Sequence, residues 1–224
     1  MNFSLIVPIA ADKQIYDCQL PPMFSLNKEG ISFCIKAIMG LNLEIFDNIY
    51  FVILGKHDEK YGLCDFLNLQ FKKLGLTNAQ VVSLDEPTRS QAETVYKAIK
   101  CMNINGSIYI KDADSYFEGI INEHNCVAVY PLEKLNWVNP RDKSYVAVDD
   151  MFYVTNIIEK RIVSHFFSAG GYGFEDSELF CLYYEKLNNK GAQLYLSHII
   201  YSMLLDNIIY RPIIVNNYVD FEMI

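Results

Sequence analysis

Hydrophobic and polar positions in the first half of the chain alternate between short β-branched runs and longer helically spaced segments. Phe3–Ile9 is an apolar run that ends in polar loop residues, which is typical of a buried parallel strand. The same reasoning predicts strands at Asn48–Leu54, Ala79–Leu84 and Ser107–Lys111, and helices at Ile31–Leu41, near His57–Leu74 and at about Ser90–Cys101. Strands that alternate with helices predict a three-layer, Rossmann-like α/β fold with a mostly parallel central sheet. Ligands bind such folds at the carboxyl ends of the strands.

The pattern changes in the second half of the chain. An Asp149-Asp150 pair stands between two strand-like segments and suits a hairpin turn. This half is therefore predicted to form an antiparallel, substrate-binding portion of the same domain, which spans residues 1–224. Its predicted elements are strands at Cys126–Pro131, Ser144–Val148, Met151–Ile158 and Phe167–Phe174, helices at Ser177–Asn188 and Leu194–Asp206, and a last strand at Ile208–Val215.

Composition narrows the classes of protein to consider. Of 224 residues, 51% are hydrophobic and 21% are charged, which is typical of a globular protein. The formal net charge of -8 argues against nucleic acid and anionic membranes as partners. The sequence has no apolar run long enough to span a bilayer and no basic start of a signal peptide, so we expect a cytoplasmic protein. Six scattered cysteines without a CxxC motif indicate neither a zinc site nor a disulfide framework.

Two aspartates follow a predicted strand in the segment IYIKDADSYF. The strand Ser107–Lys111 delivers Asp112 and Asp114 to its carboxyl end, where α/β sheets place ligands. Mg²⁺ usually binds through one or two carboxylates plus substrate phosphates, so the pair is a candidate metal-phosphate site. A helix N-cap or a solvated turn is the alternative interpretation of this motif.

A second candidate segment is IIEKRIVSHFFSAGGYGF. Glu159 and Lys160 close a predicted strand, and Lys160 offers the compact positive charge that a phosphate monoester requires. A surface ion pair would explain the same lysine. Gly170 and Gly171 allow the backbone to approach a ligand closely, although a β-bulge is the more common reason for such a pair.

The third segment, PTRSQAETVYKAI, predicts the start of a helix. Thr88 or Ser90 can cap it, and Glu93 follows Ser90 by three residues, which is the spacing of a capping box. Gln91 could present the donor and acceptor of its amide to the edge of a nucleobase.

Taken in order, these segments resemble the sugar-phosphate nucleotidyltransferases, which join a nucleoside triphosphate to a sugar-1-phosphate and release pyrophosphate. IYIKDADSYF is similar to the segment whose Asp holds magnesium, and PTRSQAETVYKAI is similar to the base-recognition turn and helix. IIEKRIVSHFFSAGGYGF resembles the Glu-Lys strand and the Gly-Tyr-Phe strand that follows it. LYLSHIIYSMLLDN and NNYVDFEMI resemble the helix before the second metal Asp and the segment that carries it. The resemblance covers nearly the whole chain and implies the nucleotide-diphospho-sugar transferase fold.

The resemblance also implies Mg²⁺ as the cofactor, and a nucleoside triphosphate and a phosphorylated sugar as ligands. It points to the synthesis of surface-polysaccharide precursors and leaves a homo-oligomer open. The implied roles are Mg²⁺ binding by Asp114 and Asp220, binding of the sugar phosphate by Lys160, of the sugar by Glu159 and of the base by Gln91, with Ser90, Gly171 and Asp112 completing the substrate site. We expect Asp114, Asp220 and Lys160 to converge on one pocket.

The segment Ala10–Phe24 departs from the family pattern. The family has a glycine-rich loop ending in Arg and then a Leu-Pro-Lys-Pro segment, whereas this chain reads VPIAADKQIYDCQLPPMF. Pro22 stands where the family Lys would fall, and Lys13 and Lys28 are the only nearby substitutes. Lys13 is included among the predicted catalytic residues with Asp114 and Lys160. The chain also stops just after Asp220, where the family continues, which is compatible with an N-terminal part of a longer protein.

Two other functions fit parts of the pattern. The first is a glycosyltransferase that uses Asp112-Ala113-Asp114 as a DxD metal motif; the opening strand FSLIVPIA also resembles that family. The second is a catalytically silent relative that binds a nucleotide or another subunit, which the rewritten Ala10–Phe24 loop favours.

Overall fold

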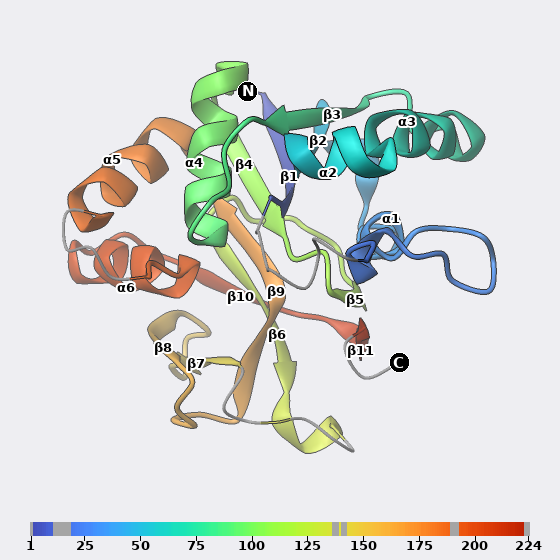
Figure 1. Cartoon of the computed structure of the whole chain (residues 1–224). Coiled ribbons are helices and arrows are strands. Elements are labelled where there is room, and N and C mark those ends of the chain that lie inside the picture. Colours follow the sequence, from blue (N-terminus) through green and yellow to red (C-terminus); the bar gives the residue numbers. More distant parts are fainter. Residues whose placement is uncertain (1, 11–18, 136–138, 140–142, 189–192, 222–224) are drawn as a thin grey trace.

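A computed structural model describes residues 2–10, 19–135, 139, 143–188 and 193–221 of the chain. These residues form a nine-stranded mixed sheet flanked by helices, together with a separate two-stranded sheet (Figure 1). Seven strands of the large sheet lie in the order β10-β6-β9-β4-β1-β2-β3. Their bounds are β1 Phe3–Ile9, β2 Asn48–Leu54, β3 Ala79–Leu84, β4 Ser107–Lys111, β6 Cys126–Pro131, β9 Phe166–Phe174 and β10 Arg211–Ile214.

Three strands of the parallel part, β1, β2 and β4, are buried almost throughout, and β3 is a half-buried edge strand. β1 pairs in parallel with β2 and β4, and β2 pairs in parallel with β3. Ile6 belongs to a core shared with α4 (Gln91–Met102), α5 (Ser177–Asn188) and α6 (Leu196–Leu205), whereas Leu5 and Val7 belong to a core shared with α1 (Phe33–Lys36) and α3 (Leu63–Leu74). Because successive side chains of a strand point to opposite faces, these contacts place one layer of helices on each side of the sheet. The three-layer arrangement is confirmed.

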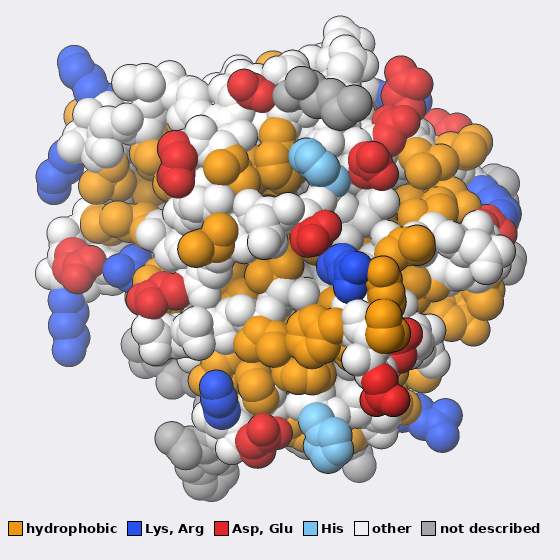
Figure 2. Space-filling view, turned by 180° about the vertical axis from the view of Figure 1, so that it is seen from behind, with side chains coloured by type: hydrophobic (Ala, Val, Ile, Leu, Met, Phe, Trp, Pro, Cys, Tyr) orange, Lys and Arg blue, Asp and Glu red, His pale blue; other side chains and the backbone are white. Residues whose placement is uncertain are grey.

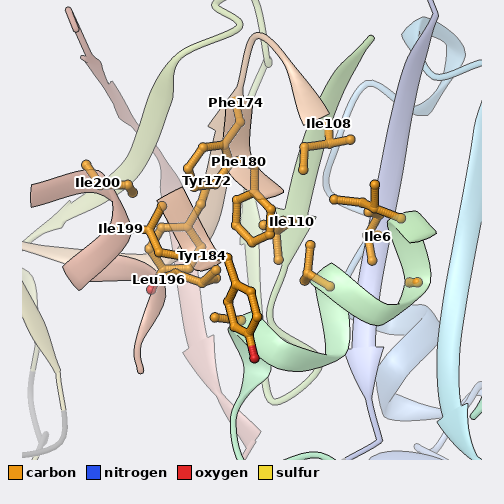
Figure 3. Packing of buried hydrophobic residues seen from close by; sticks show 14 of the residues in the cluster. Ile6, Ile108, Ile110, Tyr172, Phe174, Phe180, Tyr184, Leu196, Ile199 and Ile200 are labelled. Atoms are coloured by element: carbon orange, nitrogen blue, oxygen red, sulfur yellow. The ribbon is translucent and has the colours of Figure 1, made fainter. Parts of the chain in front are cut away.

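Aromatic and aliphatic side chains fill the first of these cores. Ile6, Ile108 and Ile110 face away from the sheet toward Phe180 and Leu196, which come from α5 and α6 (Figure 3). Burial of such side chains is the main contribution to the stability of the fold. It also fixes the positions of β4 and of the N-terminus of α6 relative to one another.

The antiparallel part is organised by β9. This strand pairs antiparallel with β4, β6 and β7 (Ser144–Val148), and β7 forms a hairpin with β8 (Val154–Glu159). The predicted turn at Asp149 is present, because the Asp149 carboxylate accepts the backbone N–H groups of Met151 and Tyr153. β8 therefore begins at Val154, three residues later than predicted. Figure 1 shows β9 extending from the sheet to the β7–β8 hairpin.

Two short strands were not predicted from the sequence. β5 (Ser115–Glu118) follows the turn after β4, and β11 (Asn216–Asp220) pairs with it antiparallel near the C-terminus. β5 and β11 form a sheet separate from the large one. The pairing sets Asp220 opposite Ser115, which brings the end of the described chain beside the end of β4.

Three predicted elements differ in extent from the structure. The helix predicted near His57–Leu74 is two helices, α2 (Gly55–Tyr61) and α3, because Gly62 has a φ of +63° and ends the first one in the left-handed conformation. The helix predicted at Ile31–Leu41 is limited to the four residues of α1, and the last predicted strand to the four residues of β10. Short 3₁₀ turns lie at Pro22–Phe24, Leu43–Ile45 and Leu132–Lys134.

No helix in the described part of the chain is long and apolar enough to cross a membrane. On the face shown in Figure 2, acidic and basic side chains alternate around several patches of hydrophobic ones. A hollow of about 850 Å³ lies where β10 meets the β5–β11 sheet, and its lining includes Met39, Glu118, Ile120, Phe152 and Arg211. It lies apart from the carboxyl end of β4.

Candidate functional site

The turn that follows β4 is built around a buried lysine. Lys111 is fully buried, and its ammonium donates to the carbonyl oxygens of Asp112 at 2.8 Å and Ser115 at 2.7 Å, and to the Ser115 hydroxyl at 3.1 Å. The ammonium also lies 4.7 Å from the centre of the Phe117 ring. Burial lowers the pKa of Lys111 to about 8, against the raising effect of the Asp112 charge. Its three hydrogen bonds hold the turn between β4 and β5 in one conformation.

The Asp112 carboxylate points back into the protein. Its Oδ1 accepts a hydrogen bond from Gln91 Nε2 at the start of α4, and its backbone N–H donates to the Gly170 carbonyl at 2.8 Å. Gly170 has a φ of +85°, and a Cβ there would lie 2.7–2.9 Å from atoms of the Asp112 side chain, so only glycine fits. Burial, and then the neighbouring charge of Asp114, raise the pKa of Asp112 above its ordinary range. We call Lys111, Asp112, Gln91 and Gly170 the inner cluster.

Asp114 is exposed, in contrast to the half-buried Asp112. Its backbone carbonyl accepts the N–H of Phe221 at 2.8 Å. That bond continues the pairing of β5 with β11, so Asp220 lies beside Asp114. The structure thus places the two aspartates that the sequence predicted as metal ligands on paired segments of the backbone.

A lysine that the sequence did not single out lies in the same place. Lys143 Nζ is 2.6 Å from Asp220 Oδ2 and 2.7 Å from Tyr218 Oη, and the side chains of Lys143 and Asp220 are only 17% and 14% exposed. Burial by itself lowers the pKa of Lys143, but the charges and hydrogen bonds of Tyr218 and Asp220 outweigh it and hold that pKa above its ordinary value. We call Asp114, Asp220, Lys143 and Tyr218 the outer cluster.

Members of both clusters line one cavity of about 160 Å³ at the carboxyl end of β4, although Lys111 and Asp220 are not among its described lining residues. The lining is almost entirely polar and comes from the starts of α4 and α6, the ends of β4 and β8, and the middle of β9. Asp112, Asp114 and Glu159 contribute carboxylates, and Lys143 contributes an ammonium. The other described residues that line it are Gln91, Ser115, Ser144, Ser168, Ala169, Gly170, Tyr172, Tyr195, Leu196, Ser197 and Tyr218.

Glu159 is oriented by hydroxyl groups. Its Oε2 accepts hydrogen bonds from Ser144 on β7 and, at 2.7 Å, from Ser197 near the start of α6. Neither of these bonds involves Oε1, and Glu159 lines the cavity. A carboxylate held in this way can accept hydrogen bonds from sugar hydroxyls.

Lys160 lies at the edge of this arrangement. It has a φ of +58°, and its Nζ is 3.3 Å from Tyr195 Oη and 5.2 Å from the centre of the Tyr195 ring. Tyr195 lines the cavity, whereas Lys160 is not among the described lining residues. Of the three side chains expected to converge on one pocket, Asp114 lines this cavity, whereas Asp220 and Lys160 are not among its described lining residues. Each of these two contacts a lining residue instead: Asp220 contacts Lys143, and Lys160 contacts Tyr195.

The remaining predicted residues fall in different surroundings. Ser90 caps α4, because its Oγ accepts the Glu93 N–H at 3.2 Å, and Glu93 itself binds the N–H of Arg89. Gly171 faces the core, where a Cβ would lie 2.1 Å from the Tyr109 hydroxyl. Lys13 lies outside the described residues.

Asp114 and Asp220 offer too few oxygen ligands to bind a hard cation without further oxygens from a substrate. Asp114 and Asp220 supply carboxylate oxygens at neighbouring positions, but no group of three Asp, Glu, His or Cys residues in the described part of the chain is arranged to hold a metal. Mg²⁺ is commonly bound by one or two carboxylates plus phosphate oxygens. The residues present fit that second type of site.

Comparisons with known proteins agree on the fold. No protein-family model and no curated protein matches the chain. Among solved structures, a nucleoside-diphosphate-sugar pyrophosphorylase from Vibrio cholerae RC9 superposes with a TM-score of 0.78 at 15% identity, covering 96% of this chain and 94% of that one.

Two further structures are similar over almost the whole chain. The inositol-1-phosphate CTP transferase from T. maritima has a TM-score of 0.72 at 14% identity, over 98% of this chain and 87% of that one. A putative glucose-1-phosphate thymidylyltransferase from Bacillus anthracis has the same TM-score and identity, over 97% and 89%. At such low identity a structural likeness establishes the fold alone. The chain has the α/β fold shared by nucleotide-sugar pyrophosphorylases and sugar-phosphate nucleotidyltransferases, as its sequence predicted.

Proposed function

We propose that the cavity at the end of β4 transfers a nucleotidyl group from a nucleoside triphosphate to a sugar-1-phosphate or a similar phosphate acceptor, with release of pyrophosphate. The observation that carries the proposal is the position of Asp220, which β11 sets beside Asp114 although 105 residues separate Asp220 from its strand partner Ser115. A carboxylate pair at this end of an α/β sheet is where a magnesium-nucleotide complex is expected to bind.

Asp114 and Asp220 are the residues that would hold Mg²⁺, which supplies charge neutralisation of the triphosphate. The protein's own task in such a reaction is mainly to position the two reactants. An oxygen of the acceptor phosphate attacks the α-phosphorus, a new P–O bond forms, and the bond to the bridging oxygen of the pyrophosphate group breaks. Glu159 is placed to bind acceptor hydroxyls, and Lys160, beside it on the chain, to bind the acceptor phosphate at the edge of the cavity.

The base is assigned to the side of the cavity near α4. Gln91 lines that side, although its amide nitrogen is engaged by Asp112. Its remaining acceptor and donor capacity is available to a ligand. The proposal also includes Lys13 as a group that contacts the triphosphate, and a role in making precursors of surface polysaccharides in the cytoplasm.

The geometry favours this reaction over a glycosyltransferase that reads Asp112-Ala113-Asp114 as a DxD motif. The carboxylate of Asp112 is turned toward Gln91 and Gly170, and the partner that lies beside Asp114 is Asp220. Two carboxylates from distant parts of the chain thus form the outer cluster.

The test is a matrix of the common nucleoside triphosphates against sugar-1-phosphates, with Mg²⁺, in which pyrophosphate release is followed. We expect release with one preferred triphosphate, and only when an acceptor is present. Lys186→Met is the matched control variant, because Lys186 pairs with Asp206 and neither residue lines the cavity, so the rate should stay unchanged. Absence of pyrophosphate with every pair contradicts the proposal. In that case, binding of a nucleoside diphosphate-sugar but not of a triphosphate would indicate the glycosyltransferase. Binding of a triphosphate without turnover would indicate the catalytically silent relative.

A further inference from the structure

Lys143 is bound by the same carboxylate that the proposed reaction needs for Mg²⁺. Its Nζ donates a charge-assisted hydrogen bond to Asp220 Oδ2 at 2.6 Å and a second hydrogen bond to Tyr218 Oη at 2.7 Å. Asp220 Oδ2 is also within 3.5 Å of the Tyr218 hydroxyl. Asp220 Oδ2 therefore has two hydrogen-bond donors, which a cation that binds there has to displace.

The backbone of Lys143 is fixed while its side chain is long and flexible. The Lys143 carbonyl accepts the N–H of Lys160 at 2.9 Å, which extends the pairing of β7 with β8 by one residue. From that fixed point, four methylene groups allow the ammonium to reach different positions in the cavity. Lys143 and Asp114 both line the cavity, so a short movement of the ammonium away from Asp220 leaves it within the same space.

The charges around the cavity make such a movement favourable when a polyphosphate binds. The lining carries the carboxylates of Asp112, Asp114 and Glu159, and these repel the phosphates of a triphosphate. A divalent cation between Asp114 and Asp220 competes directly with Lys143 for Asp220 Oδ2. The displaced ammonium then faces the phosphates that arrive with the cation.

We propose that Lys143 is an exchange cation: it holds Asp220 in place in the absence of metal, is displaced when Mg²⁺ binds, and then contacts the phosphates of the substrate. This inference rests on the proposed triphosphate site and adds a positioning residue to it. Lys143 would supply a positive charge that the Leu-Pro-Pro sequence at residues 20–22 does not provide.

A permanent ion pair between Lys143 and Asp220 is the alternative, and it differs in its response to metal. A permanent pair keeps the ammonium on Asp220 whatever is bound. An exchange cation becomes more accessible with Mg²⁺ alone and less accessible again with Mg²⁺ and a polyphosphate.

The first experiment uses the unmodified protein. The rate of acetylation at Lys143 by a limiting amount of acetic anhydride is measured by mass spectrometry, with no addition, with Mg²⁺, and with Mg²⁺ plus inorganic tripolyphosphate. We expect Mg²⁺ to raise the rate about threefold or more, as for release from an ion pair of this kind, and tripolyphosphate to lower it again. The rate at Lys186 serves as the internal reference and should stay constant. A rate at Lys143 that is unaffected by Mg²⁺ overturns the inference.

The second experiment uses Lys143→Met, with Lys186→Met as the matched control. Binding of Mn²⁺ is followed by electron paramagnetic resonance, and binding of tripolyphosphate at saturating Mg²⁺ by calorimetry. Loss of the competing ammonium should tighten Mn²⁺ binding about threefold or more, while loss of its charge should weaken tripolyphosphate binding by a similar factor. Equal affinities in Lys143→Met and the wild type, or weaker binding of both ligands, contradict the exchange.

The outcomes separate this inference from the proposed reaction. If Lys143 responds to Mg²⁺ and tripolyphosphate as described but no acceptor gives pyrophosphate, the exchange stands and the nucleotidyl transfer fails. If pyrophosphate is released but Lys143 is insensitive to Mg²⁺, the transfer stands and Lys143 is a permanent structural partner of Asp220.

Discussion

The inner and outer clusters carry aspartates only two residues apart, yet their surroundings are opposite. In the inner cluster, the Asp112 carboxylate accepts a hydrogen bond from Gln91 and lies against Gly170. The buried ammonium of Lys111 donates to the Asp112 backbone carbonyl. In the outer cluster, Asp114 is exposed and its neighbours Asp220 and Lys143 form an ion pair at the cavity. The comparison shows that the two carboxylates of one Asp-x-Asp motif can differ in environment: that of Asp112 is held by a hydrogen bond from Gln91, and that of Asp114 is exposed at the cavity.

The difference arises from the turn after β4. Ala113 is buried between the two aspartates, and Asp114 is more exposed than Asp112. Variants of the two clusters should therefore separate into those that affect the stability of the fold and those that affect ligand binding.

Lys111→Met should have the largest effect on stability. The methionine can fill the space of the lysine stem, but it leaves the carbonyls of Asp112 and Ser115 without their shared donor. We expect a loss of about 3–5 kcal/mol in the free energy of unfolding, the cost of removing one partner from a buried charged network. Urea denaturation measures it. A loss below about 1 kcal/mol would show that the inner cluster does not order the turn.

Gly170→Ala should rank second. The residue has a φ of +85° and its new Cβ would meet the Asp112 side chain, so both the backbone and the contact become strained. Strain of this kind costs about 1–3 kcal/mol. Gly75→Ala is the matched control, because Gly75 has a similar φ of +73° with no atom within 4 Å of the position of a Cβ. If both variants lose the same stability in thermal denaturation, the contact with Asp112 contributes nothing.

Asp220→Asn should have a moderate effect on stability. The variant loses the ionic part of the contact with Lys143 but keeps an oxygen that can accept a hydrogen bond. Because both side chains are mostly buried, we expect a loss of about 1 kcal/mol. Asp114→Asn, in an exposed position of the same cluster, should change the free energy of unfolding by less than about 0.5 kcal/mol. A larger loss from Asp114→Asn than from Asp220→Asn would contradict the description of the outer cluster.

Asp206→Asn should have the smallest effect on stability. It measures the contribution of an ion pair that lies outside both clusters. The hydrogen bond from Tyr183, and then that from Lys186, hold the pKa of Asp206 below its ordinary value. A carboxylate with a lowered pKa in the folded state stabilises the protein above its unfolded-state pKa, and this contribution is lost as the pH falls. The melting temperature of the variant should therefore be slightly lower than that of the wild type at pH 7, and the difference should shrink as the pH falls through the lowered pKa of Asp206. A difference that persists at low pH would show another cause.

Local patterns in the sequence predicted much of what surrounds the site. The β-branched runs predicted β1, β2, β3 and β4 with their bounds. Of these, β1, β2 and β4 are buried almost throughout, and β3 is a half-buried edge strand. The capping spacing at Ser90 gave the start of α4, and the position of Asp112 and Asp114 after β4 located the cavity. These features depend on neighbours in the sequence, which periodicity and turn chemistry describe well.

The features that were not predicted depend on contacts between distant segments. The pairing of β5 with β11 joins short strands about a hundred residues apart, and neither has a distinctive pattern. Lys143 stands in no recognisable motif, and only that pairing shows that it meets Asp220. The orientation of Asp112 toward Gln91 could not be predicted either, because it depends on the space that Gly170 leaves on β9.

The most direct measurement compares Asp114→Asn with the wild type in the reaction itself. With the preferred triphosphate, Mg²⁺ and acceptor, kcat/KM for pyrophosphate release is determined for both proteins, and their melting temperatures are recorded under the same conditions. The account predicts a fall in kcat/KM of about 100-fold or more with an almost unchanged melting temperature in the absence of ligands. A variant that keeps the rate of the wild type would contradict the assignment of the outer cluster as the site that binds the metal and the nucleotide.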